Sequence, residues 1–257
     1  MAPAWWPDPI GLTRVIVPIV GTNAREAQDQ AIEIADSDAD MVEWRADCLG
    51  EQAKISHGRR MSRLAETERV VALASILRVL VAPKPLIFTW RTATEGGRGS
   101  RLADANYEDL TQAVIQAHAA SLVDVEVRHQ ASARLIETAH DYRIPVIGSW
   151  HDMVDTPPES IIVDRLAMIE QAGVDVVKLA VTPRRDDDVT ALMNATAERS
   201  GDAAVPLVTV AMGEMGLVSR VLGYIFGSQA TFASMAGESA PGQPKLAELR
   251  RLWALAE

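Results

Sequence analysis

Eight short runs of apolar, mostly β-branched residues recur along this chain of 257 residues. Most are separated by segments with apolar residues at three- and four-residue spacing, which is typical of amphipathic helices. Near-continuous apolar strands joined through helices indicate a parallel sheet covered on its outer face, and eight such units predict a closed (β/α)8 barrel, an α/β fold. The runs lie at 14–20, 40–45, 85–91, 122–127, 144–150, 174–181, 205–212 and 229–234, and the last gives the weakest strand signal.

The chain carries no Pro- or Ser-rich linker and no low-complexity tract that would separate two parts. Its length is typical of one barrel, so we expect residues 1–257 to form a single domain. The stretch 51–82 matches no motif, and it is long enough to hold an additional helix.

Charge and composition exclude several classes of function. The formal net charge of -10 argues against a nucleic-acid surface and against binding to anionic membranes. The N-terminus has neither the basic start nor the apolar run of a secretory signal, and no apolar stretch is long enough to span a bilayer. Cys48 is the only cysteine, which rules out an internal disulfide and a thiolate zinc cluster. We therefore expect a cytoplasmic protein without bound metal.

In a (β/α)8 barrel the active site lies at the C-terminal ends of the strands. Polar residues at those ends are therefore candidates, because burying ionisable groups costs free energy unless they pair or take part in chemistry. The sequence places these polar residues and segments there: Glu43, Arg45, Asp47, Arg91, Glu95, Glu126, His151, Asp152, Lys178, 212–220 and 234–243.

Lys178 interrupts the apolar run VDVVKLAV, and only four of the 25 basic residues are lysines. An amine at the end of a barrel strand can attack a carbonyl carbon when its surroundings disfavour the ammonium form, and Arg45 or Arg91 would be a suitable neighbouring cation. The alternative is a structural lysine whose amine reaches solvent at the barrel end.

His151 is the one histidine that follows a predicted strand directly, in SWHDM. Imidazole exchanges protons near neutral pH, so His151 is a candidate general acid and base. A capping or core histidine is the alternative.

Glu43 and Arg45 stand two residues apart in VEWR, so on a strand they share one side and Trp44 faces the other. They either form a buried salt bridge with each other or bind substrate hydroxyls.

Six segments, in this order, closely resemble the type I 3-dehydroquinate dehydratases of the shikimate pathway. They are EWRAD (43–47), TWRTATEGG (89–97), SWHDM (149–153), VVKLAV (176–181), GLVSRVLGYIFGSQATF (216–232) and ESAPGQ (238–243). The resemblance implies a cofactor-free syn elimination of water from 3-dehydroquinate, giving 3-dehydroshikimate. It also implies a homodimer.

The resemblance assigns a role to each candidate residue. Lys178 forms the Schiff base, His151 transfers the protons, and Glu95 orients His151. Arg220 binds the substrate carboxylate. The remaining residues are implied to bind the substrate or to close over it: Glu43, Arg45, Arg91, Ser239 and Gln243.

Two positions depart from the family pattern. Pro18 stands where many relatives carry a serine, and Met153 replaces an aromatic residue that usually follows the histidine.

Two other functions fit parts of the sequence. A class I aldolase also places a Schiff-base lysine on the sixth strand, but its sugar phosphates require a phosphate-binding loop, whereas SAPGQ suits a carboxylate. A catalytically inactive binding barrel is disfavoured because Lys178, His151 and Glu95 are all present.

Overall fold

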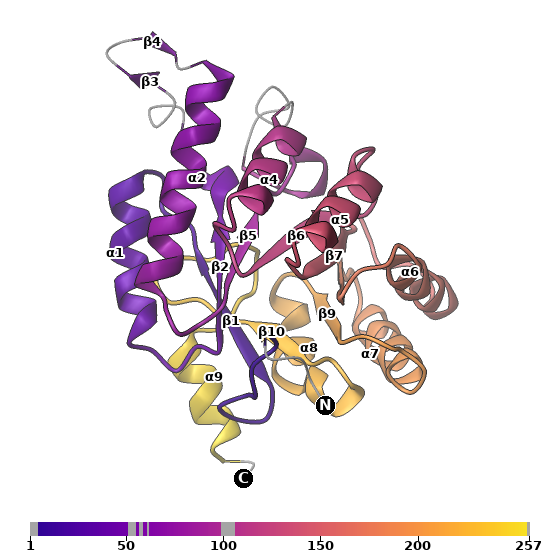
Figure 1. Cartoon of the computed structure of the whole chain (residues 1–257). Helices are drawn as coiled ribbons and strands as arrows, with labels where there is room; N and C mark the ends of the chain where they lie inside the picture. Colours follow the sequence, from indigo (N-terminus) through magenta and orange to yellow (C-terminus); the bar gives the residue numbers. More distant parts are fainter. Residues whose placement is uncertain (1–4, 51–54, 57–58, 61, 99–105, 256–257) are drawn as a thin grey trace.

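The computed structural model of the chain describes residues 5–50, 55–56, 59–60, 62–98 and 106–255. Eight parallel strands form its centre, hydrogen-bonded in the order β10-β1-β2-β5-β6-β7-β8-β9 (Figure 1). An isolated parallel bridge between Leu207 and Ser228 joins the two ends of this sheet, so the barrel is nearly closed. The strands are β1 (Arg14–Ile19), β2 (Met41–Arg45), β5 (Leu86–Thr89), β6 (Leu122–Glu126), β7 (Val146–His151), β8 (Val176–Val181), β9 (Leu207–Ala211) and β10 (Ala230–Phe232).

Seven of these strands lie within the predicted apolar runs, and β7 extends one residue beyond its run, to His151, so the predicted barrel is confirmed. A helix follows each strand and covers the outside of the sheet (Figure 1). The helices are α1 (Ala24–Ala35), α2 (Arg63–Leu80), α4 (Tyr107–Gln116), α5 (Ser132–Asp141), α6 (Glu159–Gln171), α7 (Asp186–Ser200), α8 (Leu217–Leu222) and α9 (Leu246–Trp253).

Local sequence signals set several helix starts. Asn23 precedes α1, and its side chain accepts a hydrogen bond from the backbone N–H of Glu26. Ser62 caps α2 in the same way. The first turn of α7 carries three aspartates, whose charges favour the positive end of the helix dipole. No helix in the described part of the chain combines the length and the apolar character needed to cross a bilayer.

The stretch 51–82 contains α2 and a short antiparallel hairpin, β3 (Ile55–Ser56) with β4 (Arg59–Arg60). This α2 is the regular helix that follows β2 in the barrel, so the described residues of the stretch contain no helix beyond the barrel set. The hairpin projects beyond the N-terminal end of α2 (Figure 1). Residues 51–54, 57–58 and 61 of this stretch lie outside the described residues.

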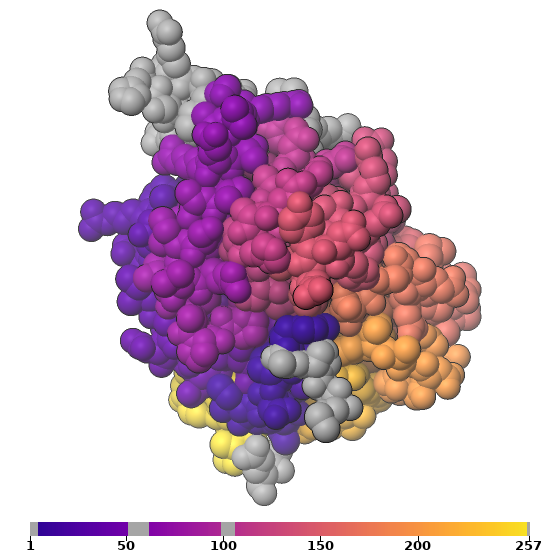
Figure 2. All heavy atoms as spheres, in the orientation of Figure 1, coloured from indigo at the N-terminus to yellow at the C-terminus, as the bar shows by residue number. Residues whose placement is uncertain are grey.

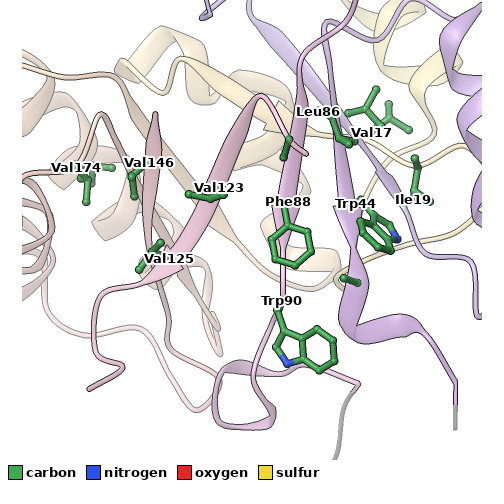
Figure 3. Close-up of a cluster of buried hydrophobic side chains, with 14 of the residues drawn as sticks. Val17, Ile19, Trp44, Leu86, Phe88, Trp90, Val123, Val125, Val146 and Val174 are labelled. Carbon is green, nitrogen blue, oxygen red and sulfur yellow. The ribbon is translucent and has the colours of Figure 1, made fainter. Parts of the chain in front are cut away.

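The larger apolar core fills the space between the sheet and the helices. Outward-facing side chains of neighbouring strands lie side by side in it, and Trp44 meets Phe88 edge to face at 5.7 Å between ring centroids (Figure 3). The alternation along β2 therefore turns Trp44 outward and leaves Glu43 and Arg45 facing the lumen.

A second apolar cluster fills the lumen at the N-terminal ends of the strands. Trp6 is 1% exposed and packs there against residues such as Ile16 and Met41, and the Arg14 guanidinium lies 5.0 Å from the centre of the Trp6 ring. Trp6 belongs to the segment that precedes β1. Figure 2 shows the described part of this segment, in indigo, at the surface of the viewed face. The N-terminal end of the lumen is therefore apolar, and the polar side chains of the lumen lie at its C-terminal end.

Candidate active site

One pocket lies at the C-terminal ends of the strands, as the fold predicts. It brings together the nine side chains to which the resemblance gives a role, although they come from six different strands and the segments that follow them. They are Glu43, Arg45, Arg91, Glu95, His151, Lys178, Arg220, Ser239 and Gln243. The other candidates, Asp47, Glu126 and Asp152, do not line this pocket.

Lys178 lies in the middle of β8, and its side chain is 8% exposed. Its Nζ lies 3.0 Å from Oδ2 of Asp124 and 3.4 Å from Oε1 of Glu43, and it sits 4.7 Å from the centre of the Phe232 ring. Two carboxylates contact the amine directly, while Arg45 and Arg91, the cations expected near it, line the same pocket. This pocket therefore accommodates a positive charge at Nζ.

Asp124 is the main residue that the sequence analysis missed. Its carboxylate contacts Lys178, NH2 of Arg91 at 2.8 Å and Oγ of Ser149 at 2.6 Å. Burial alone would raise the pKa of Asp124, but the charges of Arg91 and Lys178 outweigh burial and lower the pKa to about 2. The available signal was the acid in LVDVE, two residues before Glu126 and hence on the same side of β6.

Arg91 holds the acidic side chains in place. NH1 donates to Oε1 of Glu126 at 3.0 Å and to Oγ of Ser149 at 2.9 Å, while NH2 donates to Asp124. Burial would lower the pKa of Arg91, but the surrounding carboxylates raise it. Arg91 therefore stays charged and organises the floor of the pocket.

His151 and Glu95 form a hydrogen-bonded pair. Oε2 of Glu95 lies 3.0 Å from Nδ1 of His151 and also accepts from the His151 backbone N–H at 3.0 Å. An ionised Glu95 places the imidazole proton on Nδ1 and leaves Nε2 as the proton acceptor. Burial and nearby cations lower the pKa of His151 well below its usual value. Burial also raises the pKa of Glu95 to about 7.

Glu43 and Arg45 do not form the salt bridge that one reading of VEWR predicted. Arg45 makes a bidentate ion pair with Asp47, with N–O distances of 2.7 and 2.8 Å. Its NH1 donates to the backbone oxygen of Ser239 at 2.8 Å. Glu43 accepts from Thr89 at 3.0 Å in addition to its contact with Lys178. Arg45 thus fastens the loop that follows β10 over the pocket, and Glu43 lies beside the amine.

Arg220 of α8 is a buried cation with an unused donor. It is 2% exposed, its NH2 donates to the backbone oxygen of Pro241 at 3.2 Å, and its buried Nε has no hydrogen-bond partner among the described residues. Burial lowers the pKa of Arg220 to about 10, and Glu238 opposes the shift. A buried guanidinium with an unused donor suits an anionic ligand.

The loop after β10 closes this end of the pocket. The Gln243 side chain donates to Oγ of Ser239 at 2.9 Å and accepts from the Ser239 backbone N–H at 3.0 Å. Gly242 adopts a φ of +77°, and a Cβ there would lie 2.1 Å from the backbone oxygen of Gly213. Glycine is therefore required for the loop to approach the segment after β9 this closely.

Two departures from the family pattern also lie at this end of the barrel. Pro18 pairs in register with Glu43 on the neighbouring strand, so the departure lies next to a pocket residue. Met153 lines the pocket and packs over Gly96, where a Cβ would lie 2.6 Å from its terminal methyl carbon. Met153 is thus an apolar wall of the pocket.

A barrel that gathers an amine, an imidazole–carboxylate pair and a guanidinium with an unused donor at the C-terminal ends of its strands is built as an enzyme. The family model for type I 3-dehydroquinase matches residues 15–257. The chain belongs to the type I 3-dehydroquinase family, a family of hydro-lyases.

Curated relatives agree with this assignment. The chain is 35% identical to the 3-dehydroquinate dehydratase of Bacillus licheniformis, over 94% of this chain and 91% of the relative. It is 32% identical to the 3-dehydroquinate dehydratase of Salmonella typhimurium, over 93% of this chain and 91% of the relative.

Solved structures show the same barrel. The 3-dehydroquinate dehydratase of Geobacillus kaustophilus superposes with a TM-score of 0.85 at 31% identity, covering 95% of this chain and 90% of the other. The type I 3-dehydroquinate dehydratase of Clostridium difficile, solved with covalently modified comenic acid, superposes with a TM-score of 0.83 at 32% identity, covering 96% and 92%.

Proposed function

We propose that this chain converts 3-dehydroquinate to 3-dehydroshikimate in the shikimate pathway, through a Schiff base on Lys178. The observation that carries the proposal is the placement of the buried Lys178 amine in one pocket with the His151–Glu95 pair and with Arg220. Membership of the family supports the reaction, and the covalent modification in the Clostridium difficile relative supports a covalent route.

The chemistry begins when Lys178 gives up one proton and attacks the ketone carbon as the free amine. The ketone oxygen takes up that proton and a second one from the nitrogen, and it leaves as water. The resulting iminium is a cation, so it keeps the electrostatic contact that Asp124 makes with Lys178. It also draws electrons from the adjacent C–H bond. The acidic surroundings of Nζ therefore suit the intermediate as well as the resting ammonium.

His151 then removes the proton from the carbon next to the iminium, and the electrons of that C–H bond enter the iminium to give an enamine. The enamine expels the neighbouring hydroxyl group, which takes a proton from His151 and leaves as water. Because the same imidazole takes and returns the proton, the elimination occurs on one face of the ring. Hydrolysis of the iminium frees the product and Lys178.

Substrate orientation follows from the charges. Arg220 takes the carboxylate of the substrate, and Ser239 and Gln243 close over that end. Glu43 and Arg45 lie where they can bind ring hydroxyls, and Arg91 acts by fixing the surrounding acids. Enclosure by the loop after β10 limits access of water to the iminium.

The direct test is borohydride reduction in the presence of 3-dehydroquinate, followed by intact-protein mass spectrometry and peptide mapping. We expect a stable adduct on the peptide that contains Lys178 and growth of enone absorbance in the unreduced reaction. A well-folded protein that gives neither signal contradicts the proposal. Adduct formation with a sugar phosphate instead would favour a class I aldolase.

Replacing Arg220 with glutamine is expected to raise KM for 3-dehydroquinate by about 10- to 100-fold with a smaller change in kcat. Hydrogen bonds to a charged group contribute about 1.5–3 kcal/mol, and the loss falls mainly on binding. Steady-state kinetics on enone formation measure both constants. Arg220→Lys keeps the charge but loses the planar guanidinium, so its KM should lie between those of the wild type and Arg220→Gln. An unchanged KM in Arg220→Gln would remove Arg220 from the substrate site.

The family resemblance also supports a homodimer. Light scattering during size-exclusion chromatography tests this assembly, with an expected mass of twice the 27.8 kDa of one chain. A peak at the mass of one chain across the working concentration range contradicts it.

A further inference from the structure

Arg128 lies just after β6, outside the pocket that holds the substrate-facing residues. Its Nε donates to Oε1 of Glu95 at 3.1 Å, and its NH2 donates to the backbone oxygen of His151 at 3.3 Å. Glu95 thus uses one carboxylate oxygen for His151 and the other for Arg128. Within the described part of the chain, Arg128 thus contacts both His151 and Glu95 from the side away from the pocket.

Glu95 also separates two hollows of the molecule. On one side is the pocket with Lys178, and on the other is a second hollow that Arg128 lines together with Thr92 and Glu126. The side chain of Arg128 is 43% exposed, whereas that of Glu95 is 2% exposed. Arg128 therefore supplies a countercharge to a buried carboxylate from the solvent side.

The charges around Glu95 oppose one another. Burial raises its pKa, Arg91 lowers it from a distance of 3.7 Å, Glu126 raises it, and Arg128 lowers it. The pKa of His151 is lowered by burial and then by four cations, which are Arg91, Lys178, Arg45 and Arg128. Arg128 thus acts on both groups in the same direction, toward an ionised Glu95 and a neutral His151.

The guanidinium of Arg128 is itself held in place. It lies 4.9 Å from the centre of the Trp150 ring, and the guanidinium of Arg165 lies 4.6 Å from the same ring. Arg165 in turn pairs with Asp152 at 2.7 Å. Because Trp150 precedes His151 on β7, this stacking ties the position of Arg128 to the strand that carries the imidazole.

We propose that Arg128 is a positioning residue that fixes the ionised Glu95 carboxylate against Nδ1 of His151. The inference rests on the proposed function only in taking His151 as the group that transfers protons in the reaction. The orientation of the pair is a property of the protein without substrate, so it can be measured separately.

The test compares Arg128→Met with the wild-type chain and with Arg165→Met. In Arg128→Met we expect kcat at pH 7 to fall about 10-fold and KM to stay within about twofold. The acid limb of the kcat profile should move up by about one pH unit, because Glu95 has lost a countercharge. Arg165→Met removes the other cation on Trp150 but leaves the hydrogen bonds of Arg128 to Glu95 and His151 in place, so the acid limb of its kcat profile should match that of the wild type. Arg128→Lys keeps the charge and should restore the limb.

Nitrogen NMR of His151 without substrate provides a second readout. We expect the wild-type imidazole to carry its proton on Nδ1, and Arg128→Met to show mixed tautomers and a titration midpoint at higher pH. If Arg128→Met retains the Nδ1 tautomer and the wild-type titration, the proposal is overturned, even where thermal stability has fallen. Arg128→Gln provides the same comparison if the methionine variant does not fold. If the wild-type protein gives no borohydride adduct, the result counts against the proposed function. The NMR comparison then still decides whether Arg128 positions Glu95.

Discussion

Lys178→Ala is expected to lose at least about 10⁴-fold in turnover and to give no borohydride adduct. Without the amine there is no iminium, and the C–H bond next to the ketone keeps its low acidity. The remaining residues of the pocket can bind the substrate but have no electron sink to use. Enone formation measures the rate, and intact-protein mass spectrometry measures the adduct.

The fold should survive this change. Asp124 retains its bonds to Arg91 and Ser149, and Glu43 retains its bond to Thr89. Loss of one partner of a buried ion pair nevertheless destabilises the chain by about 3–5 kcal/mol, against a total stability of about 5–15 kcal/mol. The difference in melting temperature between the wild type and Lys178→Ala should become smaller as the pH falls from 8 toward 4. In the variant, Asp124 or Glu43 then takes up a proton, which removes the uncompensated negative charge.

Lys245→Ala is the matched control for this lysine. Lys245 is exposed just before α9 and does not line the pocket, so its replacement should leave turnover and labelling unchanged. Appreciable turnover in Lys178→Ala, with Lys245→Ala as active as the wild type, would overturn the covalent route.

The strands of this barrel were predictable because both faces of each strand are buried. Helices cover the outer face and packed side chains fill the lumen, so each strand reads as a short apolar run between helical segments. Even the weak run QATFAS contains β10, since Ala230 and Phe232 face the apolar lumen. Polar residues interrupting such runs, above all Lys178, were therefore informative.

The neighbours of Lys178 were not predictable in the same way. Alternation along a strand tells which side chains face the lumen, but not which of them meet across it. The approach of Asp124 to Lys178 depends on the register between β6, β7 and β8, in which Lys178 pairs with Ser149 and Ser149 pairs with Glu126. The sequence LVDVE by itself does not indicate that Asp124 contacts Lys178.

The contacts that close the loop after β10 were unpredictable for another reason. Arg45 and Arg220 both donate to backbone oxygens, those of Ser239 and Pro241. A backbone oxygen has no sequence signature, so the sequence cannot indicate which donor meets it. Arg128 likewise acts from outside the lumen, where an exposed arginine is ordinary.

His151→Ala is expected to separate capture of the substrate from elimination. Lys178 keeps its own contacts in this variant, so the ketone should still form a Schiff base, and borohydride should still trap it. Proton removal from the adjacent carbon loses its base, and we expect enone formation to slow by about 10²- to 10⁴-fold. Rapid-quench trapping at successive times measures adduct formation, and absorbance measures elimination.

Two further variants sharpen this result. Glu95→Gln keeps a side chain of the same shape but cannot accept from Nδ1 with a full negative charge, so its elimination rate should lie between those of the wild type and His151→Ala. His129→Ala controls for the removal of a histidine, since His129 bonds to the backbone of Ala131 and lines only the second hollow of the two. If His151→Ala forms no adduct while His129→Ala behaves as the wild type, then His151 is needed for Schiff-base formation itself. If His151→Ala eliminates water at the wild-type rate, another group takes the proton, and the His151–Glu95 pair is not the base of this site.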